Sequence, residues 1–291
     1  MRQEPEPPQD RFITANGLRL HYLEWGKPGQ KTIILLHGFN NCAATWIPLA
    51  GKLAPRRHVL ALDQRGHGDS QWSEGGFYRN EYLAGDLAAF IEALNLKRVS
   101  LIGHSMGGNV ALKYAATHPE KVARLVIVDI GPEMSRRVET RAAQMLSMKK
   151  DVYPSLDEAA AYLEAADPLA ARELLLQEAA YLTRRLPDGG FTWKQHQMFL
   201  GGNAPKPAGP VSARNEEKWQ MMRRVTCPTL VLRGEESDIL DEEVARKMVA
   251  EIPLGEMVNI AGAGHYVHRD NPARFEKEVR HFLGLKSPSR N

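Results

Sequence analysis

Short runs of apolar and β-branched residues recur along the chain and predict the strands of a sheet. Each run is bounded by glycine, proline, asparagine or charged residues, as strands usually are. The predicted strands cover residues 12–15, 18–25, 32–38, 58–63, 98–103, 125–130, 229–234 and 255–260. From the third run onward, apolar residues at every third or fourth position predict intervening helices. These helices cover residues 43–54, 80–96, 106–118, 241–252 and 273–285.

Alternation of strands and helices predicts an α/β fold with a mostly parallel eight-stranded sheet, flanked by helices and starting with an antiparallel hairpin at one edge. The alternation stops after Gly131, where the chain becomes rich in alanine, leucine, methionine and arginine and shows no convincing strand. We expect a helical cap there, inserted after the sixth strand, with helices at 136–150, 157–166, 169–185 and 214–224. The predicted parts are a disordered leader (1–10), the core (11–131 and 225–285), the cap (132–224) and a tail (286–291).

Composition excludes several classes of protein. The 291 residues include 43% hydrophobic and 25% charged residues, and no apolar run approaches the roughly 20 residues that span a bilayer. The 38 basic and 35 acidic residues give a net charge of +3, and the basic pairs are scattered, which argues against a nucleic-acid partner. The first ten residues lack the apolar core of a signal peptide, so we expect a cytoplasmic protein without a membrane partner.

Polar motifs follow the predicted strands, at the edge of an open α/β sheet where ligands bind. These motifs are HGFNN, DQRGHGDS, GHSMGG, DIGP, GEESD and GAGHYVH. Among them, Gly103-His104-Ser105-Met106-Gly107 has the G-x-S-x-G pattern of a nucleophile elbow, in which side chains at Gly103 and Gly107 would collide with neighbouring backbone. Serine is also a favoured helix N-cap, so the pentapeptide alone leaves both roles open.

A serine nucleophile needs a base and an orienting acid. Asp238 follows the seventh predicted strand and His265 the eighth, which gives the chain order Ser, Asp, His. With these motifs in order, residues 11–285 resemble the α/β-hydrolase fold family, specifically its capped, esterase-like serine hydrolases. The resemblance implies Ser105 as nucleophile, His265 as general base and Asp238 as acid, with the backbone N–H groups of Phe39 and Met106 as the oxyanion hole. It implies no cofactor and no metal.

Alternatives remain for several residues. Asp129, at the end of the sixth strand, is the alternative acid. His37 is interpreted as a residue that shapes the oxyanion loop, and His268 as no metal ligand despite the H-x-x-H spacing. The charged loop DQRGHGDS is interpreted as braced by its own ion pairs, and both Cys42 and Cys227 as small buried side chains.

The expected function is hydrolysis of a carboxylic ester or lactone through an acyl-enzyme on Ser105. The resemblance leaves a carbon–carbon bond hydrolase and a cofactor-free perhydrolase as alternatives, and a non-catalytic ligand receptor as a different class. An aminopeptidase would need a carboxylate in the cap to hold the substrate amine, for which Glu164, Asp167 and Glu178 are candidates. We expect a small, apolar ester as substrate, and a monomer or homodimer.

Overall fold

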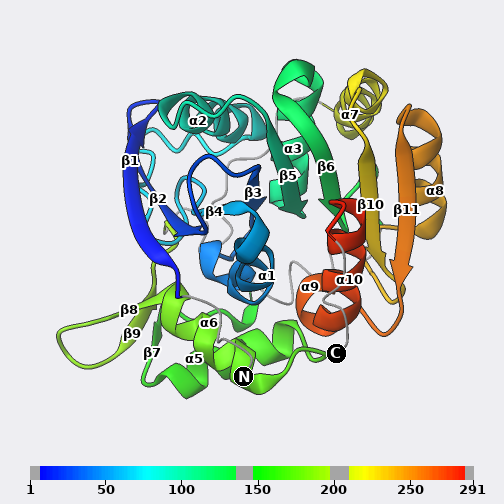
Figure 1. Cartoon of the computed structure of the whole chain (residues 1–291). Coiled ribbons are helices and arrows are strands. Elements are labelled where there is room, and N and C mark those ends of the chain that lie inside the picture. Colours follow the sequence, from blue (N-terminus) through cyan, green and yellow to red (C-terminus); the bar gives the residue numbers. More distant parts are fainter. Residues whose placement is uncertain (1–6, 136–146, 197–209, 286–291) are drawn as a thin grey trace, which may run out of the picture.

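The apolar runs form one central sheet, as predicted (Figure 1). The computed structural model describes residues 7–135, 147–196 and 210–285. In spatial order the strands are β1 (Gln9–Ala15), β2 (Leu18–Trp25), β4 (His58–Leu62), β3 (Thr32–Leu36), β5 (Val99–His104), β6 (Val122–Val128), β10 (Thr229–Gly234) and β11 (Gly255–Ile260). Strands β1 and β2 pair antiparallel to each other and to β4, and the remaining pairs are parallel, which confirms the predicted fold class.

The central strands are buried on both faces, and their side chains alternate between two cores. In β3, Ile33 and Leu35 point into one apolar core while Ile34 and Leu36 point into the other. All five residues of β3 are buried, as expected of a parallel strand covered by helices on both sides. This alternation explains why the central strands appear in the sequence as continuous apolar runs.

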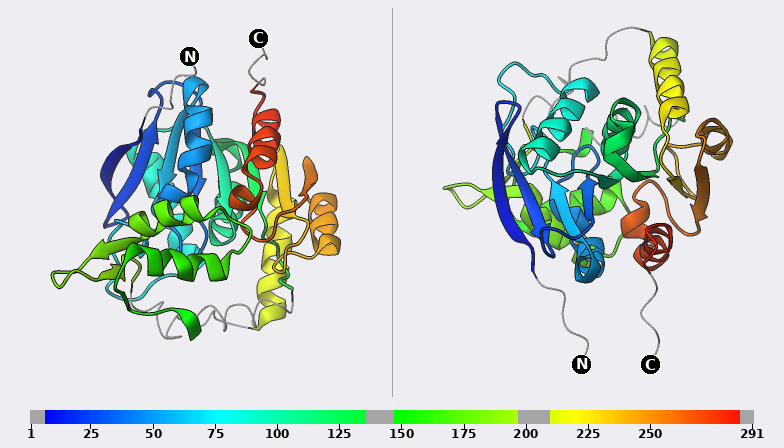
Figure 2. Two further views of the ribbon diagram at one scale, coloured as in Figure 1. Left: turned by 90° about the horizontal axis from the view of Figure 1, so that it is seen from below. Right: turned by 45° about the horizontal axis from the view of Figure 1, so that its top comes forward.

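Helices cover both faces of the sheet (Figure 2). One core includes side chains of α2 (Asn80–Ala93), α3 (Met106–Thr117), α7 (Val211–Arg224) and α8 (Glu242–Glu251). The other core includes side chains of α1 (Ile47–Leu53) and α10 (Pro272–Phe282). The shorter helices are η1 (Ala43–Trp46), η2 (Ala54–Arg56), η3 (Pro119–Lys121) and α9 (Val267–Asp270).

The chain between β6 and β10 contains strands as well as helices, which corrects our expectation of a purely helical insertion. It includes α5 (Leu156–Ala166), α6 (Arg172–Leu182) and an antiparallel sheet of β7 (Val152–Tyr153), β9 (Phe191–Trp193) and β8 (Thr183–Arg185). Strands of two or three residues are too short to leave a periodic pattern in the sequence. Helix α5 begins as predicted, because Ser155 Oγ accepts a hydrogen bond from the backbone of Glu158.

The insertion divides between two places in the molecule. Helices α5 and α6 and the small sheet lie below the main sheet in Figure 1, at the end toward which β5 and β11 point. Helix α7 instead lies between α3 and α8, and its Trp219 and Met222 are buried in the core of that face. We therefore use "cap" below for residues 147–196 alone.

The ends of the predicted parts differ slightly from the structure. Strand β1 begins at Gln9, within the expected leader, because Gln9 and Asp10 pair with Glu24 and Leu23 of β2. The expected tail, most of the predicted helix at 136–150 and most of the loop at 201–212 lie outside the described residues.

Candidate active site

Ser105 lies at a sharp turn between β5 and α3. Its φ of 50° and ψ of −115° lie outside the regions that L-residues favour, and its N–H donates a hydrogen bond to Val128 O at 3.0 Å. Ser105 occupies the N-cap position of α3, but its side chain makes no capping hydrogen bond. The Ser105 hydroxyl therefore does not cap the helix, which was one of the two roles that the sequence left open.

The predicted glycine requirement of this turn is confirmed. A Cβ atom on Gly103 would lie 2.3 Å from Gly107 O, and one on Gly107 would lie 2.3 Å from Leu36 O. Both neighbours are backbone atoms, which cannot move aside as a flexible side chain could. Only glycine allows β3, β5 and the start of α3 to approach this closely.

His265 follows β11 and is buried beside the elbow. His104, next to Ser105, donates from Nε2 to His265 O at 2.9 Å, and the two rings lie 4.6 Å apart. On its other side, His265 Nδ1 lies 2.8 Å from Asp129 Oδ2. Because a carboxylate accepts, Nδ1 carries the hydrogen and a neutral His265 has its lone pair on Nε2. This is the tautomer that a general base requires.

The partner of His265 is Asp129, and this corrects our preference for Asp238. Nδ1 has one hydrogen, and Asp129 accepts it. Strands β6 and β10 are neighbours, so Asp129 and Asp238 follow adjacent strand ends and chain order could not separate them. Asp129 is fully buried, and its carboxylate also accepts from Gly234 N at 3.0 Å and from Ser237 Oγ at 2.6 Å. The residue before Asp238 therefore supports the Asp129 carboxylate.

The loop after β3 lies against the elbow. A Cβ atom on Gly38 would lie 2.6 Å from His104 Nδ1 and 3.4 Å from Ser105 Cβ. His37 is buried, its Nδ1 donates to Gly38 O at 2.8 Å, and its Nε2 accepts from Gln64 N at 3.0 Å. With both ring nitrogens bonded to backbone, His37 shapes this loop, as the sequence predicted.

The two proposed oxyanion donors flank the elbow. Met106 is the first residue of α3, where a backbone N–H has no acceptor within its own helix. Phe39 lies in the loop directly after Gly38. Their function as an oxyanion hole remains a proposal.

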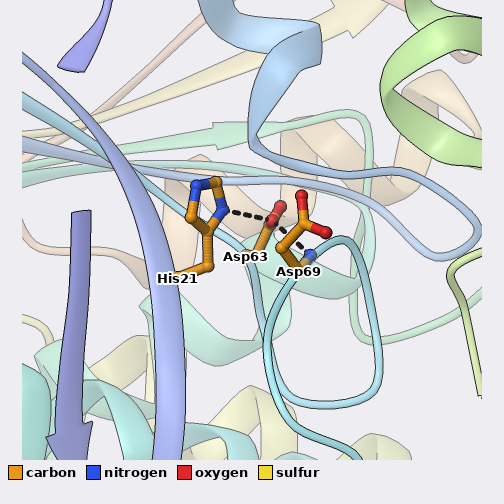
Figure 3. A group of neighbouring side chains, drawn as sticks. All are labelled: His21, Asp63 and Asp69. Carbon is orange, nitrogen blue, oxygen red and sulfur yellow. Dashed lines mark hydrogen bonds and ion pairs between the residues drawn. The ribbon is translucent and has the colours of Figure 1, made fainter. Parts of the chain in front are cut away.

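The loop after β4 is braced by ion pairs with residues outside it, which corrects our expectation that it would be braced by its own ion pairs. Asp63 pairs with His21, Arg65 with Asp86 and Asp69 with Lys194. Figure 3 shows His21, Asp63 and Asp69, whose ligand atoms lie within 4.8 Å of one another. The Asp63 carboxylate accepts hydrogen bonds from His21 Nδ1 at 2.7 Å, from Asp69 N at 2.9 Å and from Ala43 N at 2.6 Å. The pKa of His21 is raised: burial lowers it, but the hydrogen bond and charge of Asp63 outweigh that effect. These bonds explain the cluster without a bound ion.

An aminopeptidase would need a carboxylate in the cap to hold the substrate amine, and each of the three candidates pairs with an arginine. Arg269 of α9 contacts Glu178 at 2.8 Å and Asp167 at 3.2 Å, and all three side chains are buried. Glu164 pairs with Arg172 at the surface. Because their charges are compensated within the protein, the structure gives no support to an aminopeptidase site on these residues.

Two further expectations concern single side chains. His268 is buried, stacks on Trp46 and bonds from Nε2 to Thr45 Oγ1 at 2.9 Å. Cys42 and Cys227 are both buried and free, as predicted, and burial raises the pKa of each thiol.

Sequence reasoning missed Lys149. Its Nζ lies 3.2 Å from Asn40 Oδ1, next to Phe39, and 2.7 Å from Gln195 Oε1. Burial lowers the pKa of this lysine to about 7. The sequence shows only one of two adjacent lysines, Lys149 and Lys150, and carries no signal that the first turns toward the loop after β3.

Comparison with known proteins agrees with this architecture. A family model described as the alpha/beta hydrolase fold matches residues 31–272. The chain is 30% identical over 260 residues to an sn-1-specific diacylglycerol lipase of Mus musculus, covering 86% of this chain and 80% of that protein. It is 26% identical over 279 residues to a putative 2-succinyl-6-hydroxy-2,4-cyclohexadiene-1-carboxylate synthase of Bacillus subtilis, covering 94% and 97%.

Solved structures share the fold. The crystal structure of E-2-(acetamidomethylene)succinate hydrolase superimposes with a TM-score of 0.84 at 24% identity, covering 96% of this chain and 100% of that one. A marine microorganism esterase superimposes with a TM-score of 0.71 at 29% identity, covering 91% and 100%. Among the described residues, no helix is both long and apolar enough to cross a membrane.

Proposed function

Because the chain belongs to the α/β-hydrolase fold family, we propose that it hydrolyses a carboxylic ester or lactone through an acyl-enzyme on Ser105. His265 would take the Ser105 proton and later return it to the leaving group, and Asp129 would hold the imidazole in its useful tautomer. The N–H groups of Phe39 and Met106 would stabilise the oxyanion, each such donor being typically worth about 10²–10³ in kcat. No cofactor takes part in this scheme.

The observation that carries the proposal is the bond between His265 and the buried Asp129, formed beside a strained serine turn. His265 Nδ1 and Asp129 Oδ2 lie 2.8 Å apart. A buried carboxylate that fixes one imidazole tautomer is what serine hydrolysis needs. The named activities of the relatives include a lipase, an oligomer hydrolase, a synthase and an epoxide hydrolase, so they support the family and no single reaction or substrate.

A serine nucleophile also separates this chain from one relative. An epoxide hydrolase of Caenorhabditis elegans is 25% identical over 283 residues. Epoxide hydrolases of this fold use an aspartate nucleophile, and this chain has Ser105 at that position. The carbon–carbon bond hydrolases and perhydrolases use the same triad. The former tend to carry glycine and proline after the HG motif, where this chain has Phe39, Asn40 and Asn41, and the latter differ near the oxyanion loop.

Labelling with a fluorophosphonate probe tests the proposal directly. The wild-type protein should become covalently labelled at Ser105, located by peptide mass spectrometry, and the Ser105→Ala variant should not. His265→Ala should slow labelling at least about a thousandfold, because the hydroxyl loses its base.

The complementary measurement is turnover of p-nitrophenyl esters of increasing chain length, with lactones alongside. Saturable hydrolysis that disappears in Ser105→Ala would support the proposal. A folded wild-type protein that neither labels nor hydrolyses any member of this panel would overturn it.

A further inference from the structure

Lys149 is partly buried, and its described contacts are to uncharged groups. Its ammonium donates to Asn40 Oδ1 at 3.2 Å and to Gln195 Oε1 at 2.7 Å, and it lies 5.2 Å from the centre of the Trp193 ring. Among the described residues, no carboxylate lies within ion-pair distance of Nζ. The nearby titratable groups are Asp151, two residues along the chain, and His67.

The polar neighbours of Lys149 are fixed in orientation. His67 Nδ1 donates to Arg65 O at 3.1 Å, so its Nε2 accepts from Gln195 Nε2, also at 3.1 Å. Burial lowers the pKa of His67 to about 3, which keeps this ring neutral and able to accept. The amide oxygen of Gln195 is consequently directed at Lys149. An ammonium has three N–H donors, and two of them are used here.

The Lys149 ammonium contacts the proposed oxyanion loop through Asn40. Asn40, which holds Lys149, follows Phe39 directly, and Gly38 lies against Ser105. An acyl group on Ser105 with its carbonyl oxygen at Phe39 N–H would therefore have the Lys149 ammonium close to its chain. A partly buried cation with no compensating carboxylate among the described residues costs free energy, and such groups cluster at functional sites.

We propose that Lys149 binds a carboxylate carried by the acyl part of the substrate, so that the preferred substrates are anionic half-esters of short dicarboxylic acids. This inference rests on the proposed ester hydrolysis at Ser105. Asn40 and Gln195 hold the ammonium in place, and the substrate carboxylate supplies a negative charge that the described residues do not place beside it. Lys149 is then a specificity-determining residue that touches the substrate.

The test compares two isosteric esters. p-Nitrophenyl hemisuccinate carries a terminal carboxylate, and p-nitrophenyl 4-methylpentanoate replaces it with a neutral isopropyl group. For Lys149→Met we expect kcat/KM for hemisuccinate to fall about 10- to 100-fold, the usual effect of losing a hydrogen bond to a charged group. The neutral ester should change less than about threefold. Lys149→Arg should recover part of the loss.

Lys150→Met is the matched control. Lys150 is the adjacent lysine, but it is exposed and pairs with Glu158 at 3.3 Å. We expect this variant to leave the kcat/KM values of both esters unchanged. An equal loss on both esters in Lys149→Met would show a purely structural lysine and overturn the inference.

The pH dependence gives a second readout. With a pKa of about 7, Lys149 loses its proton as the pH rises through neutrality. The ratio of kcat/KM for the anionic and neutral esters cancels the pH dependence of the triad itself. This ratio should fall above about pH 7 in the wild type and stay flat in Lys149→Met. A wild-type ratio that does not change between pH 6 and 9 would contradict the assignment.

Failure of the hydrolase proposal is distinguishable from failure of this inference. If the wild type hydrolyses neither ester, calorimetric binding of monomethyl succinate to Ser105→Ala and to the Ser105→Ala/Lys149→Met double variant still tests Lys149. Tighter binding by the variant that retains Lys149 supports the site. Equal Kd values in the two variants reject it.

Discussion

Ser105 and Asp129 both adopt positive φ angles, 50° and 49°, at the ends of neighbouring strands β5 and β6. Non-glycine residues held in such conformations cost about 1–3 kcal/mol each and persist where the surroundings over-determine them. In this protein, a backbone hydrogen bond to the neighbouring strand holds each of the two residues. Ser105 N–H bonds to Val128 O, and Asp129 N–H bonds to Leu232 O at 2.8 Å. Each strained residue is thus held by the strand beside it.

Asp129→Asn should lower kcat by about 10³–10⁴, because an amide in place of the carboxylate no longer secures the Nδ1–H tautomer of His265. Asp238→Asn, the matched variant on the adjacent strand end, should retain kcat within about tenfold. The measurement is ester turnover, with circular dichroism to confirm that both variants fold. Loss of turnover in Asp238→Asn with retention in Asp129→Asn would return the acid to Asp238.

The lysine proposed to bind substrate should also cost stability. The pKa of Lys149 falls from its usual 10.5 to about 7 on folding, so the unfolded chain binds more protons between these pH values. The free energy of unfolding due to this group therefore rises with pH across that window and is lowest below pH 7. Lys149→Met should accordingly be more stable than wild type at pH 6, with the difference shrinking toward pH 10, in urea denaturation.

At the residue scale, the sequence predicted the sharp turn at Ser105 and its two glycines, because the fixed spacing of the G-x-S-x-G motif determines them. It did not identify the acid, since Asp129 and Asp238 both follow strands and only the neighbouring positions of β6 and β10 in space decide between them. Lys149 lay beyond prediction for a similar reason. Its partners Asn40 and Gln195 are distant in sequence, and contact between them depends on how the cap folds back.

At the scale of elements, long periodic segments were predictable and short ones were not. The strands of the main sheet and α2, α3, α5, α8 and α10 lie close to their predicted ranges. Strands β7, β8 and β9 contain two or three residues each and are stabilised by pairing with one another. The position of α7 on the sheet could not be predicted either, because the apolar face of a helix shows that the helix is packed but not against which surface.

The buried link between α6 and α9 should be energetically important. Arg269 contacts both Glu178 and Asp167, and its side chain is 4% exposed. Arg269→Met would leave two buried carboxylates without their partner, which should lower the free energy of unfolding by about 3–5 kcal/mol in urea denaturation. Arg246→Met, which breaks the exposed pair with Glu242, should leave the midpoint unchanged. Similar midpoints for both variants would show that α6 does not depend on this link.

At the scale of the whole molecule, the cap shares its hydrophobic core with the sheet. Tyr153, Leu175 and Trp193 of the cap belong to the same buried cluster as Leu35 and Val126 of the main sheet. The cap therefore has no separate core of its own among the described residues.

A shared core predicts a single cooperative unfolding transition. Far-UV circular dichroism reports on all helices, and hydrogen exchange of the α5 and α6 peptides reports on the cap alone. Both should give the same denaturant midpoint as exchange of the β5 peptide. An earlier midpoint for the cap peptides would show that the cap opens as a separate unit.

The hydrogen bond from Ser237 to Asp129 has a consequence for how such sites diversify. Ser237 Oγ and His265 Nδ1 approach the same oxygen, at 2.6 Å and 2.8 Å, from the ends of β10 and β11. An acidic side chain in place of Ser237, being longer than serine, would extend into the space that the Asp129 carboxylate now fills. The imidazole therefore meets its acceptor at a point that side chains from the ends of both β6 and β10 reach. Reciprocal exchange of the residues at 129 and 237 would move the carboxylate from the end of β6 to the end of β10, two substitutions that leave His265 unchanged.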